Sequence, residues 1–290
     1  MLDLSKLKPY IGIGDTNVCY KNGVADPLGD KIELTVQLTN KCNSKCTFCS
    51  NSLFKDYDFD INKFMEVFNT LNSNYTIAKV AFTGGEPTLH PDFVKLVKFV
   101  RTKLPRANIV VNTNASHLEV LEEITGLDIE FGISRHHFDD NKNWEIFKSS
   151  APAGSKDLKN FSEKENVLLH CNLIKGYIDS IDKCVDYINW CKENGFKEVG
   201  FVELMPYTQA AIDDKATIKV MDFPVEKFVI TRFAERKGIC NCMNGIYNGV
   251  RVYNRKMCAS NCKNIVSTPL VYNLNKLSKG FGGDIIWDLS

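Results

Sequence analysis

The sequence has no apolar stretch long enough to cross a bilayer, and its N-terminus, Met1 to Lys6, lacks the apolar core of a signal peptide. It has no large excess of either charge, because 36 Lys and Arg residues face 35 Asp and Glu residues, a formal net charge of +1. Proteins that neutralise many phosphates need such an excess of Lys and Arg. Internal repeats and low-complexity tracts are also missing. These absences argue against a membrane protein, a secreted protein and a nucleic-acid-binding protein.

Cysteine, by contrast, is abundant, since the chain has 11. Without an export signal, so many thiols indicate a reducing cytosol and metal ligation rather than disulfides. We therefore expect a cytoplasmic protein with at least one metal site.

Three of the cysteines, Cys42, Cys46 and Cys49, form a C-x3-C-x2-C triplet directly after the apolar run Ile32–Leu38. This spacing suits three corners of a cubane iron–sulfur cluster, and no fourth cysteine is near, so one iron would stay open to a small molecule. A zinc knuckle is the first alternative, although structural zinc sites take four ligands. Three reduced structural thiols are the second, although thiols packed in a core would not sit in a loop of Asn, Lys and Ser.

A second motif, Thr83-Gly84-Gly85-Glu86-Pro87-Thr88, follows the next apolar run, 78–82. Adjacent glycines let a backbone approach a ligand closely, at the strand end where ligands bind in parallel sheets. The alternative is an ordinary strand-to-helix turn, with Pro91 in the first turn of the helix.

The 290 residues can bury a sizeable core, and apolar runs alternate with amphipathic ones, which predicts an α/β protein with a parallel sheet. The predicted strands are Ile32–Leu38, Val80–Phe82, Asn108–Asn112, Ile129–Ile133, Val167–Leu173 and Val199–Leu204. The predicted helices include Asn62–Leu71, Pro91–Leu104, Leu118–Ile124, Ile181–Asn194 and Val225–Arg236. We expect an N-terminal lead-in (1–31), a core (32–223) and a C-terminal extension (224–290).

In this order and at this separation, the cysteine triplet and the Gly-Gly-Glu-Pro turn resemble the radical S-adenosylmethionine (radical SAM) superfamily. The resemblance implies a partial (β/α)6 barrel, a [4Fe-4S] cluster on Cys42, Cys46 and Cys49, and SAM on the open iron. It places Gly84, Gly85 and Glu86 at the methionyl amine and Phe48 near the adenine. It further implies reductive cleavage of SAM, hydrogen abstraction by the 5′-deoxyadenosyl radical, and a reducing partner such as a flavodoxin or ferredoxin.

Other polar residues follow later strands and are further SAM-contact candidates under this resemblance: Asn112, Ser134, Arg135 and Asn172. Each has a plainer interpretation. Asn112-Thr113-Asn114 can be turn residues that cap a loop, and a strand Asn needs partners in a core. His136 and His137 could shuttle protons, whereas Asp139 and Asp140 are expected to cap the next helix.

Four cysteines near the C-terminus, Cys240, Cys242, Cys258 and Cys262, predict an auxiliary metal site, either a second [4Fe-4S] cluster or a four-thiolate zinc site at the lower end of the barrel. Their spacing matches none of the patterns of the relatives that it resembles. Cys19 and Cys171 have no ligand-like neighbours. Cys184 and Cys191 share an apolar helix stripe and are interpreted as core thiols.

The run Glu198–Pro206 resembles a strand end of the GTP 3′,8-cyclase and its relatives, which makes Glu203 and Met205 further candidates near the cofactor, although Glu203 could be a structural carboxylate. A small-molecule substrate is therefore expected. The alternatives are modification of a ribosomal peptide, for which residues 1–31 look too short to form a leader-recognition domain, and a non-catalytic, zinc-stapled binding protein. Substrate, product and subclass (oxidoreductase, lyase or cyclase) stay open.

Overall fold

The computed structural model describes residues 31–53, 55–205, 208–218, 229–230, 243–255, 268–279 and 285–289. The strands are β1 (Lys31–Gln37), β2 (Thr76–Thr83), β3 (Asn108–Thr113), β4 (Ile129–Ser134), β5 (Asn166–Leu173), β6 (Glu198–Glu203), β7 (Val229–Ile230), β8 (Met243–Tyr247), β9 (Val250–Arg255), β10 (Thr268–Asn273), β11 (Lys276–Lys279) and β12 (Ile285–Asp288). The helices are α1 (Ile61–Asn74), α2 (Phe93–Lys103), α3 (Leu118–Glu122), α4 (Asp140–Phe147), α5 (Ser155–Ser162), α6 (Ile181–Glu193) and α7 (Gln209–Asp213), with short 3-10 turns at Ser50–Leu53 and Pro87–Leu89.

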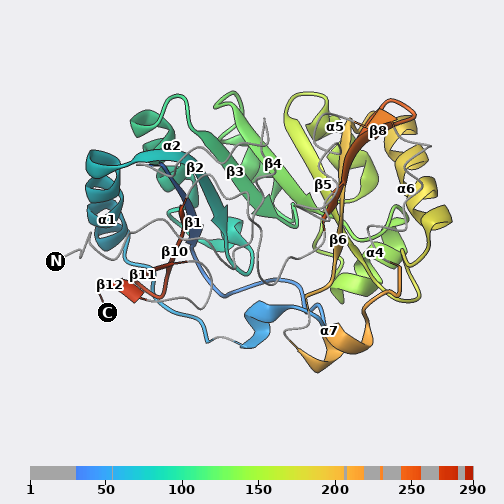
Figure 1. Ribbon diagram of the computed structural model, residues 1–290, viewed down its shortest axis with the longest axis horizontal. Helices are drawn as coiled ribbons and strands as arrows, with labels where there is room; N and C mark the ends of the chain where they lie inside the picture. The colour runs from blue at the N-terminus through green and yellow to red at the C-terminus, as the bar shows by residue number, and fades with distance from the viewer. Residues whose placement is uncertain are drawn as a thin grey trace.

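Strands β1 to β6 are parallel and lie side by side in chain order, each followed by a helix. In Figure 1 they form an arc, with α1, α2 and α6 on its outer side. This arrangement confirms the predicted α/β class and a partial barrel of six βα units. Because the strands are parallel, all six carboxyl ends lie at one edge of the sheet.

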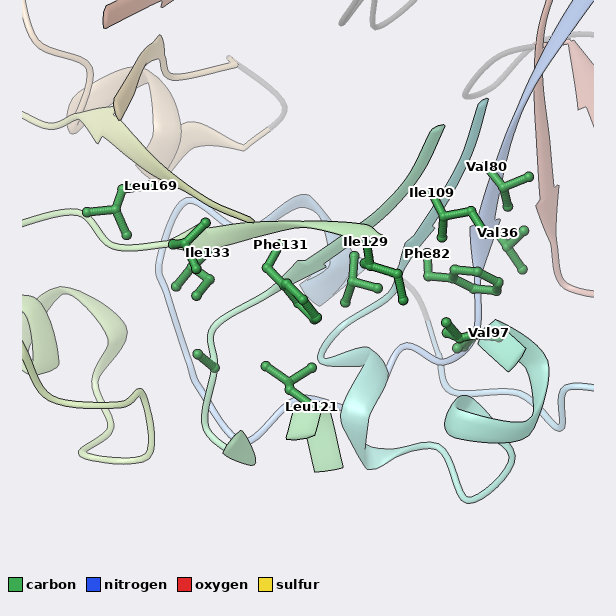
Figure 2. Close-up of a cluster of buried hydrophobic side chains, with 14 of the residues drawn as sticks. Val36, Val80, Phe82, Val97, Ile109, Leu121, Ile129, Phe131, Ile133 and Leu169 are labelled. Carbon is green, nitrogen blue, oxygen red and sulfur yellow. The ribbon is translucent and has the colours of Figure 1, made fainter. Parts of the chain in front are cut away.

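The core lies between the outer face of this sheet and the helices (Figure 2). Alternate strand residues such as Phe82, Val111 and Phe131 are fully buried there, against helix residues such as Val97 and Leu121. Each such side chain contributes about 1.5–3 kcal/mol by leaving water. The other residues of each strand face the concave side, where many are polar and only half-buried.

The four helices predicted within the core form, with shifted ends. Helix α1 runs from Ile61 to Asn74, because Asp60 caps it by accepting hydrogen bonds from the amides of Asn62 and Lys63. Helix α2 begins at Phe93, so Pro91 precedes the helix and does not occupy its first turn. Helices α5 and α7 were not predicted.

The C-terminal extension adds strands at both edges of the barrel sheet. Strand β9 pairs in parallel with β6 and carries β8 and β7, whereas β10 pairs in parallel with β1 and carries β11 and β12. The predicted helix Val225–Arg236 is wrong at Val229 and Ile230, which form β7 because the backbone of β8 pairs with them. The β-branched Val and Ile suit that strand.

The three described cysteines outside the triplet, Cys171, Cys184 and Cys191, are fully buried between β5 and α6, which confirms the interpretation of Cys184 and Cys191 as core thiols. Cys19 lies outside the described residues. Within the described ranges, no helix combines the length and the apolar character needed to cross a membrane.

Replacing Phe131 by Ala should lower the free energy of unfolding by about 3–5 kcal/mol, because a buried ring leaves a cavity. Phe131 is fully buried and its ring packs edge-on against Phe161 at 5.0 Å between centroids. Urea unfolding followed by circular dichroism measures the change. The control is Ile212→Ala at a 51%-exposed position, which should change stability by less than about 0.5 kcal/mol. Equal effects of the two substitutions would contradict the assignment of the core.

Candidate functional site: a cysteine loop held on the carboxyl edge of the sheet

The loop that follows β1, residues 38–49, lies directly on the turn that follows β2. The Leu38 amide donates to the Thr83 carbonyl at 3.0 Å. The Gly85 amide donates to Thr39 O at 2.6 Å, and the Glu86 amide donates to Lys41 O at 2.8 Å. The two motifs found in the sequence therefore form one backbone-bonded unit.

The two glycines are needed because the cysteine loop approaches so closely. A Cβ on Gly84 would lie 2.6 Å from Thr39 O, and a Cβ on Gly85 would lie 2.1 Å from Lys41 O and 2.6 Å from Asn40 O. These are backbone atoms and cannot rotate out of the way. The sequence interpretation assigned this close approach to a ligand, whereas in the structure the cysteine loop fills the space beside both glycines.

The Glu86 side chain is buried and joins the ends of β2 and β3. Its carboxylate accepts hydrogen bonds from the Thr88 hydroxyl at 2.7 Å, the Thr113 hydroxyl at 2.6 Å and the Asn114 amide at 2.8 Å. Burial raises the pKa of Glu86, and these donors oppose that shift. Because all these partners are protein groups, the carboxylate braces the strand ends.

The cysteine loop is also fastened to the end of β3. The Asn114 amide group donates to Asn43 Oδ1 at 2.9 Å, and Asn43 in turn donates to the Ser116 hydroxyl at 2.7 Å. Asn43 lies inside the cysteine triplet, so these bonds fix the position of the loop between Cys42 and Cys46.

On its other side the loop is tied to segments that follow β4 and β6. The Lys45 amide donates to Phe147 O at 2.8 Å at the end of α4, and the Ser149 hydroxyl donates to Asn43 O at 2.8 Å. The Thr47 hydroxyl donates to Asp214 Oδ2 at 2.9 Å, just after α7. Strand ends far apart in the chain thus position the three thiols.

The Asp56 carboxylate, between the cysteine loop and α1, braces the start of the loop. Asp56 accepts hydrogen bonds from the Thr39 hydroxyl at 3.0 Å and the Asn40 amide at 3.2 Å, and forms an ion pair with Lys41 at 3.0 Å. Sequence reasoning missed Asp56, Asn43 and Asp214, because nothing in their spacing links them to the positions they contact.

The three thiols share one neighbourhood. Burial, and to a smaller extent the nearby Cys49 and Cys42, raise the pKa of Cys46 to about 12. Within the described ranges, no three His, Cys, Asp or Glu side chains are arranged around a single metal ion. A cubane cluster binds each thiolate at a different iron, so three neighbouring thiols can hold three of its corners.

Comparison with known proteins decides the family. The family model of the Radical SAM superfamily matches residues 36–209, more than half of the chain. This chain belongs to the radical SAM superfamily. The family implies an enzyme that uses a [4Fe-4S] cluster and SAM, as the resemblance of the two motifs predicted.

Individual relatives are more distant. The chain is 30% identical over 177 residues to a candidate glycyl-radical enzyme activating enzyme of Methanocaldococcus jannaschii, covering 56% of this chain and 65% of that protein. It is 29% identical over 195 residues to the GTP 3′,8-cyclase of Clostridium botulinum strain Okra, covering 62% and 59%. The chain therefore spans about three fifths of the length of these relatives.

Among solved structures, Streptococcus suis SuiB bound to S-adenosylmethionine has a similar fold. The TM-score is 0.57 at 19% identity, over 67% of this chain and 45% of that chain. This likeness supports the barrel fold alone.

Within this radical SAM fold, Phe48 is half-buried beside a small apolar cluster of Ile146, Ile174 and Leu204. Its ring meets the imidazole of His136 edge-on at 5.6 Å, and that imidazole stacks on Phe147 at 4.9 Å. An apolar wall therefore adjoins the third cysteine of the radical SAM loop. The contact of Phe48 with adenine stays a prediction.

His136 is buried and neutral. The Asn172 amide donates to its Nδ1 at 3.2 Å, so the proton of the neutral ring is on Nε2. Burial lowers the pKa of His136 to about 3 and the pKa of the adjacent His137 to about 4. Two imidazoles with such low pKa values are poor proton shuttles at neutral pH.

Arg135 is buried among protein partners. Its guanidinium donates to Asp140 Oδ1 at 2.5 Å, to the Ser155 hydroxyl at 2.8 Å and to Phe138 O at 2.9 Å, and it lies 4.9 Å from the ring of Trp190. These contacts favour a role in holding the β4–α4 connection over direct contact with SAM. Asp139 caps α4 as expected, whereas the Asp140 carboxylate forms an ion pair with Arg135.

The other SAM-contact candidates, Asn112, Ser134 and Asn172, belong to strands β3, β4 and β5. They face the concave side, since their neighbours Val111, Ile133 and Cys171 are fully buried on the outer side. The structure thus brings these candidates to the same face.

Glu203 is buried at the end of β6, and Lys215 forms an ion pair with it at 3.5 Å, which favours the structural interpretation of this carboxylate. Met205 is half-buried two residues beyond it. Cys240, Cys242, Cys258 and Cys262 lie outside the described residues.

Replacing Gly85 by Ala should displace the cysteine loop, because the new methyl group would overlap the Lys41 carbonyl. We expect the variant to retain less than half of the wild-type iron after anaerobic reconstitution, measured per polypeptide. The matched control is Gly154→Ala, where the nearest atom to a Cβ is Asp140 Oδ2 at 3.4 Å, an ordinary contact, and the iron content should not change. Equal iron in both variants would show that the close approach is dispensable.

His136 should make the protein sensitive to acid. Its folded pKa of about 3 lies below the ordinary value of 6.5, so the unfolded chain takes up this proton first as the pH falls. Its contribution to stability is present above pH 6.5 and is lost towards pH 3. Between pH 7 and pH 5, His136→Gln should therefore lose about 2 kcal/mol less stability than wild type. Urea unfolding at both pH values measures this. His137 is present in both wild type and the variant, so its titration cancels in the comparison. Equal losses of stability in the two proteins would contradict the low pKa of His136.

Proposed function

We propose that this radical SAM enzyme binds a [4Fe-4S] cluster through Cys42, Cys46 and Cys49, cleaves SAM reductively, and acts on a C–H bond of a small-molecule substrate. The observation that supports this most strongly is the backbone bonding between the cysteine loop and the Gly84–Glu86 turn. A loop that only held a structural zinc ion would not need the Gly84–Glu86 turn bonded to its backbone.

When bound and reduced, by a partner such as a flavodoxin or ferredoxin, the cluster and SAM supply a 5′-deoxyadenosyl radical that abstracts hydrogen. The protein provides the three thiolates and leaves one iron without a protein ligand, since the described part of the loop offers no fourth cysteine. The backbone of Gly84 to Glu86 is proposed to position the methionyl amine.

The remaining work of the chain is to orient the ligand and exclude water, because the radical is unselective. Phe48 with Ile146, Ile174 and Leu204 supplies an apolar wall beside Cys49. Asn112, Ser134 and Asn172 supply hydrogen-bonding groups on the concave face below the loop. We propose that these polar side chains contact SAM or the substrate.

A small molecule is the preferred substrate, and the likeness to GTP 3′,8-cyclases supports that preference. The second candidate is a ribosomally made peptide, because SuiB, which shares the fold, was also solved bound to the precursor peptide SuiA. The chain covers less than half of SuiB, so this likeness carries less weight.

We also propose an auxiliary metal site on Cys240, Cys242, Cys258 and Cys262. In the described hairpin, Met243 of β8 is paired with Asn254 of β9, at the end of β9 that corresponds to the carboxyl edge. In the sequence, Cys242 directly precedes Met243 and Cys258 follows Arg255 by three residues. This pairing supports a shared site for the two cysteine pairs, and iron is preferred over zinc.

Iron, sulfide and zinc content after anaerobic reconstitution tests both metal proposals. Wild type should hold about eight irons, and a Cys42/Cys46/Cys49→Ala variant should hold about four and form no 5′-deoxyadenosine from SAM and dithionite. About four irons plus one zinc in wild type, with the irons lost in the variant, would make the C-terminal site structural. Zinc alone in wild type would overturn the proposed function.

A further inference from the structure

A glutamine is buried at the carboxyl end of β1, directly before the cysteine loop. Gln37 is only 2% exposed. Its neighbours Val36 and Leu38 are fully buried in the core on the outer face, so the Gln37 side chain lies on the concave side. A buried amide group needs hydrogen-bond partners, and these partners show what the residue can do.

The Gln37 amide group makes hydrogen bonds in three directions. Its Oε1 accepts from Asn273 Nδ2 at 2.9 Å, at the end of β10, which lies beside β1 (Figure 1). Its Nε2 donates to Asn40 Oδ1 at 2.5 Å and to Asn51 Oδ1 at 3.3 Å. A primary amide has one oxygen and two N–H groups. The oxygen and both N–H groups are in use, so the group cannot turn over without breaking these bonds.

Asn51 extends this series of hydrogen bonds to the Gly84–Glu86 turn. Because Asn51 Oδ1 accepts from Gln37, its Nδ2 points the other way and donates to the Gly84 carbonyl oxygen. Asn273, Gln37 and Asn51, from β10, β1 and the 3-10 turn after Cys49, thus form an amide relay that ends on Gly84 O. Hydrogen bonds in such a chain polarise one another.

The direction of the amide relay decides what the Gly84 carbonyl meets. If position 37 offered only acceptor atoms, Asn51 would turn its Nδ2 towards that position and its Oδ1 towards Gly84 O. Two acceptors would then face each other, and the hydrogen bond that holds the carbonyl would be lost. Gln37 therefore sets the orientation of Asn51, and Asn273 sets that of Gln37.

A fixed Gly84 carbonyl matters for the proposed SAM site. An amine that binds iron through its lone pair has only N–H groups left, and these require acceptors on the protein. A carbonyl oxygen can accept two hydrogen bonds, and Asn51 donates one of them at Gly84. The second lone pair can accept from the methionyl amine.

We propose that Gln37 is a positioning residue for SAM. Through Asn51 it holds the Gly84 carbonyl where that oxygen accepts from the methionyl amine, and Asn273 orients Gln37. This inference rests on the proposed function and adds residues of β1 and β10 to its SAM site. Because β10 belongs to the C-terminal extension, the extension contributes to SAM affinity.

The test measures ligand affinity on the reconstituted, oxidised full-length protein, so that no turnover is needed. Equilibrium dialysis gives the Kd for SAM and for 5′-methylthioadenosine, which keeps the nucleoside and the sulfur but lacks the methionyl amine and carboxylate. Iron per polypeptide is measured on the same samples. The central variant is Asn51→Asp, because it keeps the shape of the side chain, loses the donor to Gly84 O and retains the Gln37–Asn40 bond.

We expect Asn51→Asp to raise the Kd for SAM about tenfold, because an acceptor then faces the carbonyl. Asn51→Leu, which removes the donor without adding charge, should raise it as well. Iron content and the Kd for 5′-methylthioadenosine should not change in either variant. Gln37→Glu should raise the Kd for SAM by a similar factor, and Asn273→Asp by about threefold, because it acts on Asn51 only through Gln37. The matched control is Asn74→Asp, at an exposed position whose amide donates within α1, and it should change nothing.

An unchanged Kd for SAM in Asn51→Asp and Asn51→Leu would overturn the role of the amide relay. Loss of iron, or an equal loss of affinity for 5′-methylthioadenosine, would overturn it too, because these residues would then only hold the cysteine loop in place. Wild type that holds its full iron content but binds no SAM would instead remove the proposed function.

Discussion

The contact on which the rest of the site depends is the backbone bonding between the cysteine loop and the Gly84–Glu86 turn. The loop can reach the turn only because positions 84 and 85 have no Cβ. The Glu86 amide then holds Lys41 O, while the Glu86 carboxylate holds the end of β3. Glu86 thus joins β1, β2 and β3 at the edge where the thiols lie. Because Glu86 is buried, losing any one of these hydrogen bonds would leave a polar group without a partner and would destabilise the site.

The parallel sheet explains why so few residues can build this site. Parallel strands place all their carboxyl ends at one edge, so segments far apart in the chain meet there. Asn43 contacts the end of β3, Lys45 contacts the end of α4, and Thr47 contacts Asp214 after α7. The outer face of the same strands supplies the apolar core, which leaves the concave face free for polar groups. Because successive side chains of a strand point to opposite faces, the residues that stabilise the fold and the residues available to a ligand alternate along each strand.

Several features could be predicted from the sequence because their signals are local. The triplet spacing, the Gly-Gly-Glu-Pro turn and the alternation of strands and helices each arise within short segments, and the six strands lie close to their predicted positions. Helix ends were less accurate: the Asp60 cap starts α1 at Ile61, and α2 starts at Phe93, after Pro91. The helix predicted over Val225–Arg236 was wrong at β7 because pairing with β8 outweighs local pattern there.

The sequence by itself determined the family, since cysteine spacing and a glycine turn are properties of consecutive residues. Only the tertiary structure decided what several residues do. It showed that the two glycines make room for the cysteine loop and that Glu86 and Arg135 bind protein groups. These roles depend on contacts between strands that are distant in the chain. Such contacts follow from the register and curvature of the sheet, which no short stretch of sequence specifies.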